Sequence, residues 1–245
     1  MITVVTPISP IPSHPDTAIL DYTIESVRHH LPDAEIILTF DGVRHEQEDC
    51  RADYEEFIRR TLWKADHAWG NVAPWIYDEH THQAGMLRGV IDDIRTPLMF
   101  YVEQDTPLCV DRDLDLAQIS DFVMSGSSNL TRLHHEARIP DEHQHMMHGF
   151  ADDAHFLRTS QWSQRPHVAA VGYYKRILAD HFTENAHCFI EDVMHGVADE
   201  AWLCGGVDGW NAHRLHIYHP DGDIKRAWHT DGRAGAEKYE TSQTF

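Results

Sequence analysis

The first half of the chain alternates short apolar runs with longer segments whose apolar residues recur three or four positions apart. Uninterrupted apolar runs predict strands covered on both faces, and the wider spacing predicts helices with one buried side. The predicted strands span 2–5, 34–40, 72–76 and 98–102, and the predicted helices span 20–31, 47–62 and 83–94. Because right-handed crossovers join strands that alternate with helices, this order predicts an α/β fold with a Rossmann-like, mostly parallel sheet flanked by helices.

The second half of the chain has a less regular pattern. Helices are predicted at 173–181 and 191–202, and strands at 122–127 and 214–218. The polar, histidine-rich segment 130–153 supports no assignment, and the polar tail from residue 221 is typical of a loop or lid. Since no repeat or linker divides the sequence, we expect a single domain with an irregular C-terminal half.

The composition is that of a globular protein, with 42% hydrophobic and 10% aromatic residues. A formal net charge of −20, counted with neutral histidines, argues against attraction to nucleic acid or to an anionic membrane. No apolar run reaches the roughly 18 residues of a membrane-spanning helix, and the N-terminus lacks the pattern of a signal peptide. The four cysteines include no CxxC pair, so we expect free thiols and a cytoplasmic protein.

Acidic residues follow two of the predicted strands directly. Asp41 ends the strand at 34–40, and Glu103 and Asp105 follow the strand at 98–102. The carboxyl ends of parallel strands form one edge of the sheet, so these side chains should share one ligand-binding rim. Paired carboxylates there suit Mg²⁺ or Mn²⁺, although acidic residues after strands are also common as solvated turns.

A second acidic pair, Glu191 and Asp192, stands at the start of a predicted helix. A carboxylate in this position often does no more than interact with the helix dipole. The functional alternative is a general base that takes a proton from an acceptor hydroxyl.

Two basic segments stand out in this acidic sequence. The segment 225–233 contains His229 and three basic residues that would offset the charge of a diphosphate: Lys225, Arg226 and Arg233. The stretch 154–179 lacks acidic residues but contains Arg158, Arg165, Lys175 and Arg176 among aromatic side chains. It is either a structural segment covered by acidic neighbours or a surface facing an anionic or planar ligand.

The order of these motifs resembles that of GT-A glycosyltransferases, in particular the family 2-like members. The likeness runs through about the first 110 residues and then continues at scattered points. The segments that carry it are Val4 to Ser9, Asp41, His82 to Arg88, Glu103-Gln104-Asp105, Glu191-Asp192 and His229. It implies a nucleotide-sugar-binding half at 1–110 and an acceptor-binding half with a C-terminal lid at 111–245, within one domain.

The resemblance also implies roles for individual residues. The donor nucleotide sugar would contact the set Pro7, Ser9, Asp41, Arg88, Gln104, Lys225, Arg226 and Arg233. A Mn²⁺ or Mg²⁺ ion would bind Glu103, Asp105 and His229, and the base would come from Asp192 with Glu191. The metal motif begins with Glu where the family has Asp, and the Gln-x-x-Arg-Trp motif of processive synthases is absent. A processive membrane polymerase is therefore not expected.

These implications lead to the hypothesis of a glycosyltransferase that moves one sugar from a nucleoside-diphosphate-sugar to a hydroxyl. A single base opposite the leaving group predicts inversion, with retention as the alternative. The acceptor is a glycan, a protein, a small molecule or a modified nucleic-acid base, and the sequence does not distinguish these four. We expect no membrane partner. The alternatives are a non-catalytic nucleotide- or sugar-binding protein, and a hydrolase or iron oxygenase using His80-x-His82, His143-x-His145-x-x-His148 or His216-x-x-His219.

Overall fold

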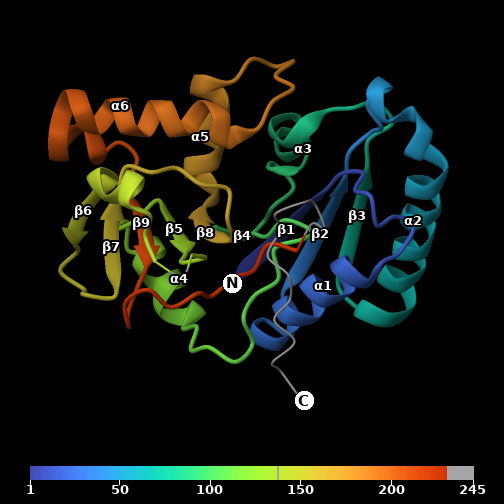
Figure 1. Cartoon of the computed structure of the whole chain (residues 1–245), viewed down its shortest axis with the longest axis horizontal. Helices are drawn as coiled ribbons and strands as arrows, with labels where there is room; N and C mark the ends of the chain where they lie inside the picture. The colour runs from blue at the N-terminus through green and yellow to red at the C-terminus, as the bar shows by residue number, and fades with distance from the viewer. Residues whose placement is uncertain (137, 231–245) are drawn as a thin grey trace.

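The computed structural model describes residues 1–136 and 138–230 of the chain. Its centre is one twisted sheet in the order β3-β2-β1-β4-β8-β5-β9-β7-β6, with helices on both faces (Figure 1). Strands β8 and β7 run opposite to the other strands of this sheet. The predicted α/β class with a mostly parallel, helix-flanked sheet is confirmed.

The first four strands form the parallel part of the sheet. They are β1 (Ile2–Ile8), β2 (Glu35–Phe40), β3 (Val72–Ile76) and β4 (Leu98–Tyr101). The helices between them are α1 (Ala18–His30), α2 (Arg51–Lys64) and α3 (His82–Val90), with a 3₁₀ turn η1 (His45–Cys50) and a π turn η2 (Ala65–Trp69) beside α2. Each of these strands and α-helices coincides with a predicted segment, because continuous apolar runs and helical spacing are local signals.

The second half of the chain extends the same sheet. Its strands are β5 (Leu130–Leu133), β6 (Met147–Phe150), β7 (Phe156–Thr159), β8 (His167–Ala170) and β9 (Leu215–Tyr218). Its helices are α4 (Leu116–Met124), η3 (Asp141–Met146), α5 (Val171–His181) and α6 (Ile190–Trp210). Strand β8 lies between β4 and β5 and pairs antiparallel with both, so it joins the two halves.

Alternation along the strands divides the core into two layers. Val4 and Ile36 face the layer that contains α1, α2 and α4, whereas Val5 and Ile37 face the layer that contains α3, α5 and α6. This period of two is what a strand buried on both faces requires. Among the described residues, no helix combines the length and the apolar character needed to cross a membrane.

The strand predicted at 122–127 is wrong. The first half of this segment lies in α4, whose buried residues Leu116, Ile119 and Val123 follow helical spacing, and the second half is a turn. The Asp115 side chain caps the helix by accepting a hydrogen bond from the Gln118 backbone N–H at 2.9 Å. A window that begins at residue 122 misses both the cap and the first half of this periodic pattern.

Candidate functional site

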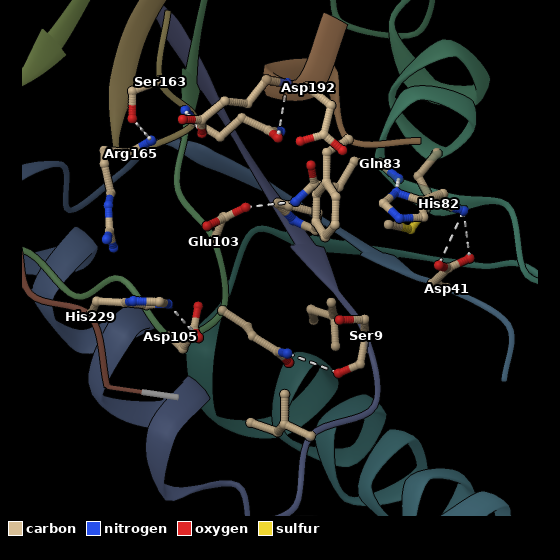
Figure 2. A pocket seen from close by; sticks show the side chains of 18 of the residues that line it. Ser9, Asp41, His82, Gln83, Glu103, Asp105, Ser163, Arg165, Asp192 and His229 are labelled. Carbon is tan, nitrogen blue, oxygen red and sulfur yellow. Dashed lines mark hydrogen bonds and ion pairs between the residues drawn. The ribbon is translucent and has the colours of Figure 1, made fainter. Parts of the chain in front are cut away.

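A pocket of about 700 Å³ opens at the carboxyl ends of β1, β2 and β4, beside the start of α6. Nine of the residues predicted to form the site line this pocket: Pro7, Ser9, Asp41, Glu103, Gln104, Asp105, Glu191, Asp192 and His229. They come from both halves of the chain, and Figure 2 shows the side chains of Glu103, Asp105, Asp192 and His229 around the pocket. The volume is within the range of about 300–1,000 Å³ that is typical of small-molecule sites.

Asp105 and His229 form the first polar contact of this pocket. Nε2 of His229 lies 3.2 Å from Oδ2 of Asp105, whose side chain is 9% exposed. The backbone holds the same two segments together, because the Thr230 N–H donates to the Asp105 carbonyl at 2.8 Å. The end of the described chain is thereby fixed against the loop after β4.

Glu103 lies beside this pair and accepts a hydrogen bond from Gln83, whose Nε2 donates to Oε1 of Glu103 at 2.6 Å. Burial, together with the nearby Asp105 charge, raises the pKa of Glu103 to about 8. Two carboxylates and an imidazole therefore surround a position where positive charge would be stabilised.

The acidic pair at the start of α6 contributes two different side chains. Glu191 is held in place, since its Oε2 accepts a hydrogen bond from the Gln164 backbone N–H at 2.9 Å while Oε1 of Gln164 accepts from the Glu191 N–H. The exposed Asp192 carboxylate makes no hydrogen bond or ion pair within the described part of the chain. Figure 2 shows Asp192 across the pocket from Asp105 and His229.

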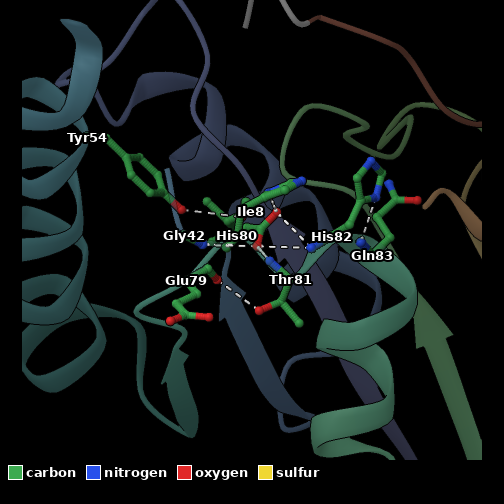
Figure 3. Close-up of polar contacts among 9 residues, drawn as sticks. Ile8, Gly42, Tyr54, Glu79, His80, Thr81, His82 and Gln83 are labelled. Carbon is green, nitrogen blue, oxygen red and sulfur yellow. Dashed lines mark hydrogen bonds and ion pairs between the residues drawn. The ribbon is translucent and has the colours of Figure 1, made fainter. Parts of the chain in front are cut away.

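Asp41 organises the start of α3, where Figure 3 shows His80, Thr81 and His82 close together. Its carboxylate, 3% exposed, accepts hydrogen bonds from the backbone N–H groups of Thr81 at 2.6 Å and His82 at 3.1 Å. Its Oδ2 also lies 2.8 Å from Nδ1 of His80. A carboxylate is stabilised at a helix N-terminus because unpaired N–H groups gather there. The predicted nucleoside contact of Asp41 stays a prediction beside this positioning role.

The loop after β1 forms another wall of the pocket. Nε2 of Gln104 donates to the Ser9 carbonyl at 2.8 Å, and the Gln104 carbonyl accepts from the Thr23 hydroxyl at 2.8 Å. These bonds hold the segment of Pro7 and Ser9 against the loop after β4. The wall is therefore fixed by polar contacts as well as by the adjacent strands.

Three predicted donor-binding residues do not line the pocket. Arg88 donates to the carbonyls of Leu178 and Phe182, so it fixes α3 against α5. Arg226 is 1% exposed, donates to the Asp113 carbonyl and stacks over Tyr218. Lys225 lies over the Trp228 ring, 4.7 Å from its centroid. In this structure the three cations make contacts within the protein, and their predicted role in donor binding stays a prediction. The fourth, Arg233, lies outside the described residues.

Two other arginines face the pocket in place of these three. Arg165 and Arg44 both line it, and neither guanidinium is hydrogen-bonded or ion-paired to any residue the structure describes. Arg165 belongs to the basic stretch identified in the sequence, whereas the other three cations of that stretch lie elsewhere. Arg44 was missed, although its position just after Asp41 at a strand end was an available signal.

The histidine motifs do not assemble as the alternative metal-enzyme hypothesis requires. His143 contacts Gln161, His148 stacks on Trp202, and Nδ1 of His216 lies 3.0 Å from the Ser128 hydroxyl. Among the described residues, the group with metal-ligand spacing is His134, His219 and Asp223, which no single motif supplies. These three residues are not among those that line the pocket.

The sequence matches no protein-family model and no curated protein. Solved structures do share its architecture. The first, S. aureus TarS 1-349 in complex with UDP-GlcNAc, gives a TM-score of 0.57 at 11% identity over 100% of this chain and 61% of that one. The second, the mannosyltransferase PcManGT from Pyrobaculum calidifontis in complex with GDP-Man and Mn²⁺, gives 0.57 at 12% identity over 90% of this chain and 55% of that one.

This chain thus spans little more than half the length of the proteins it resembles. The likeness covers the parallel sheet, the flanking helices and the extension of the sheet through the second half. We conclude that the chain has the GT-A-like fold of these glycosyltransferases.

Proposed function

We propose that this protein is a metal-dependent glycosyltransferase that moves one sugar from a nucleoside-diphosphate-sugar to an acceptor hydroxyl. The observation that carries the proposal is the convergence of Glu103, Asp105, Asp192 and His229 on one pocket. The complexes of the two similar structures, one with UDP-GlcNAc and one with GDP-Man and Mn²⁺, support the donor class and the metal. Their low identity makes the activity of this chain a proposal.

The residues around Asp105 fit a divalent cation. Mn²⁺ takes carboxylate and imidazole ligands, and Glu103, Asp105 and His229 offer two carboxylates and one imidazole. Burial and the Asp105 charge raise the pKa of Glu103, and a bound cation would favour its charged form. When bound, the ion would supply Lewis-acid stabilisation of the departing diphosphate.

The protein's own side chains would perform the remaining steps. Arg165 and Arg44 present guanidinium groups that can bind diphosphate oxygens. Asp192 would take the proton of the acceptor hydroxyl as its oxygen forms the bond to the anomeric carbon. The bond from that carbon to the diphosphate oxygen breaks, and its electron pair leaves with the nucleoside diphosphate. Because Asp192 stands across the pocket from Asp105, attack opposite the leaving group and inversion follow from the proposal.

A thermal-shift screen of nucleoside diphosphates and their sugars, with and without Mn²⁺, tests the proposal. A ligand that binds only the folded state raises the melting temperature by mass action. We expect at least one donor to stabilise the wild type in Mn²⁺, and Asp105→Ala and His229→Ala to lose that shift. His67→Ala, which removes an exposed histidine beside Asp66, is the matched control. A shift of the same size in all four proteins would refute the proposed metal site, and no shift with any donor would refute the proposed activity.

A further inference from the structure

A second cluster of metal-binding side chains lies outside the pocket. His134 follows β5 and His219 follows β9, and the register of these parallel strands pairs Leu133 with Tyr218 immediately before them. The two histidines therefore stand side by side at the same end of the sheet, with ring centroids 5.1 Å apart. Asp223, from the turn after β9, completes the group.

The ligand atoms of the three side chains all lie within 4.8 Å of one another. Oδ1 of Asp223 lies 2.9 Å from Nε2 of His219 and 3.6 Å from Nε2 of His134. Ligands at about 2.0–2.1 Å from a tetrahedral Zn²⁺ stand roughly 3.4 Å apart, so the two separations bracket the required value. Asp223 thus lies from each histidine at a distance close to the one that a shared ion requires.

His134 gives an independent reason to expect a ligand here. Its side chain is 0% exposed, and neither of its ring nitrogens has a hydrogen-bond partner. Buried polar atoms are rarely left without a partner, because the lost hydration is not recovered. A metal ion at Nε2 of His134 would satisfy one of these two atoms.

A simple ion pair with Asp223 does not explain the arrangement. The 3.6 Å separation from His134 is too long for a hydrogen bond. Burial, with the neighbouring His219 and Arg132, lowers the pKa of His134 to about 4, so its ring is neutral at pH 7. A neutral imidazole is the form that binds a metal.

We propose that His134, His219 and Asp223 bind one Zn²⁺ ion at a site separate from the Glu103–Asp105–His229 group. Two imidazoles and one carboxylate suit zinc and leave one position of a tetrahedron for water or a further ligand. Solvent reaches the site past Asp223, whose side chain is 42% exposed. No part of this assignment depends on the proposed sugar transfer.

At this location a bound ion would connect the sheet to the segment that leads to the pocket. Asp223 lies in the segment 219–230, which runs from the end of β9 back to the pocket. The Arg226 N–H donates to the His134 carbonyl at 2.7 Å, and the Trp228 N–H donates to the Pro107 carbonyl at 2.9 Å. A Zn²⁺ ion would thus link β5 and β9 to the segment that brings His229 to Asp105.

Zn²⁺ titration of the full chain tests the proposal. The starting protein carries Asp105→Ala and His229→Ala, so that the pocket group cannot bind the ion. We expect it to retain one equivalent of Zn²⁺ after gel filtration and to give the visible absorption of tetrahedral Co²⁺ when cobalt replaces zinc.

Adding Asp223→Asn should weaken Zn²⁺ binding by more than about tenfold and remove the Co²⁺ absorption. Adding Asp66→Asn instead is the matched control, because Asp66 is an acidic residue 3.3 Å from a histidine, His67, and does not belong to this cluster. Circular dichroism checks that both variants are folded. The proposal is overturned if the starting protein retains no Zn²⁺, or if the Asp223 and Asp66 variants bind it equally well.

Discussion

Nε2 of His229 lies 3.2 Å from Oδ2 of Asp105, which joins the C-terminal segment to the loop after β4. The Thr230 hydroxyl and N–H both donate to the Asp105 carbonyl, so the contact involves backbone and side chain. The C-terminal segment thereby forms one side of the pocket at the open edge of the sheet.

Asp192 should be required for transfer but not for donor binding. The Asp192→Asn side chain keeps its shape but cannot accept a proton, so we expect transfer to fall by about 100-fold or more. Donor affinity, measured by calorimetry in Mn²⁺, should stay within about twofold of wild type, because the amide preserves the local packing. Transfer at a near-normal rate would exclude Asp192 as the base.

Glu191 should behave differently from its neighbour. Its carboxylate accepts the Gln164 N–H, so Glu191→Ala leaves a partly buried donor unpaired. We expect a destabilisation of about 1–3 kcal/mol in urea unfolding, compared with less than about 0.5 kcal/mol for Asp192→Ala at its exposed position. Equal losses of stability in the two variants would contradict the positioning role of Glu191.

Arg165 should provide affinity for the diphosphate. A charge-assisted hydrogen bond contributes about 1.5–3 kcal/mol, so Arg165→Ala should weaken binding of a nucleoside diphosphate by roughly 10- to 100-fold. Arg158→Ala is the matched control from the same basic stretch, since that side chain lies over Trp210 and outside the pocket. Isothermal titration calorimetry in Mn²⁺ distinguishes them, and equal affinities would remove Arg165 from the donor site.

Metal binding should release a proton from Glu103. Its pKa of about 8 in the metal-free protein means that the carboxyl group is mostly protonated at pH 7. A metal ligand must be deprotonated, so Mn²⁺ affinity should rise with pH until about pH 8. Titrations in two buffers of different ionisation enthalpy should report close to one proton released at pH 7 and fewer in Glu103→Gln. The same release in that variant would place the proton elsewhere.

Acid should destabilise the protein through buried neutral histidines, of which His167 is a clear example. Burial lowers its pKa to about 4, and the Tyr174 hydroxyl lies 2.6 Å from Nε2. Because the unfolded state binds the proton at the ordinary pKa near 6.5, stability is present above that pH and is lost as pH falls toward 4. This residue alone should account for a loss on the order of 2 kcal/mol by pH 5.

Urea midpoints at pH 7.5 and pH 5 measure this effect. His167→Gln should lose less stability over that interval than wild type, whatever its stability at pH 7.5. His45→Gln, at an exposed position, should lose as much as wild type. An unchanged pH dependence in His167→Gln would show that its titration does not contribute.

The sequence alone was sufficient to predict those elements whose structure depends on the local pattern of apolar and polar residues. The strand at 34–40 and the acidic groups after two parallel strands were predictable, because buried strands have continuous apolar runs and their ends share one edge. Strand β8 was not predictable, because its four residues form a strand only by pairing with β4 and β5, which are distant in sequence. Gln164 and Arg165 reach the pocket through that antiparallel insertion, which depends on contacts distant in sequence.

Arg88 shows a second limit of prediction from sequence, because the pattern does not reveal which side of a helix faces the pocket. It stands five positions after Gln83, or about 140° around the helix. Gln83 faces Glu103 in the pocket, whereas Arg88 faces the end of α5. A match in motif spacing therefore does not by itself determine which way a side chain on the helix faces.

The antiparallel pairing of β8 with β4 has a practical consequence for dissecting the protein. A fragment that stops near residue 110 would lack β8, so the backbone donors and acceptors on one side of the apolar strand β4 would be unpaired. An unpaired strand edge can pair with other chains, so truncation there should yield aggregates instead of an isolated, folded fragment. The two halves of the chain therefore have to be produced together.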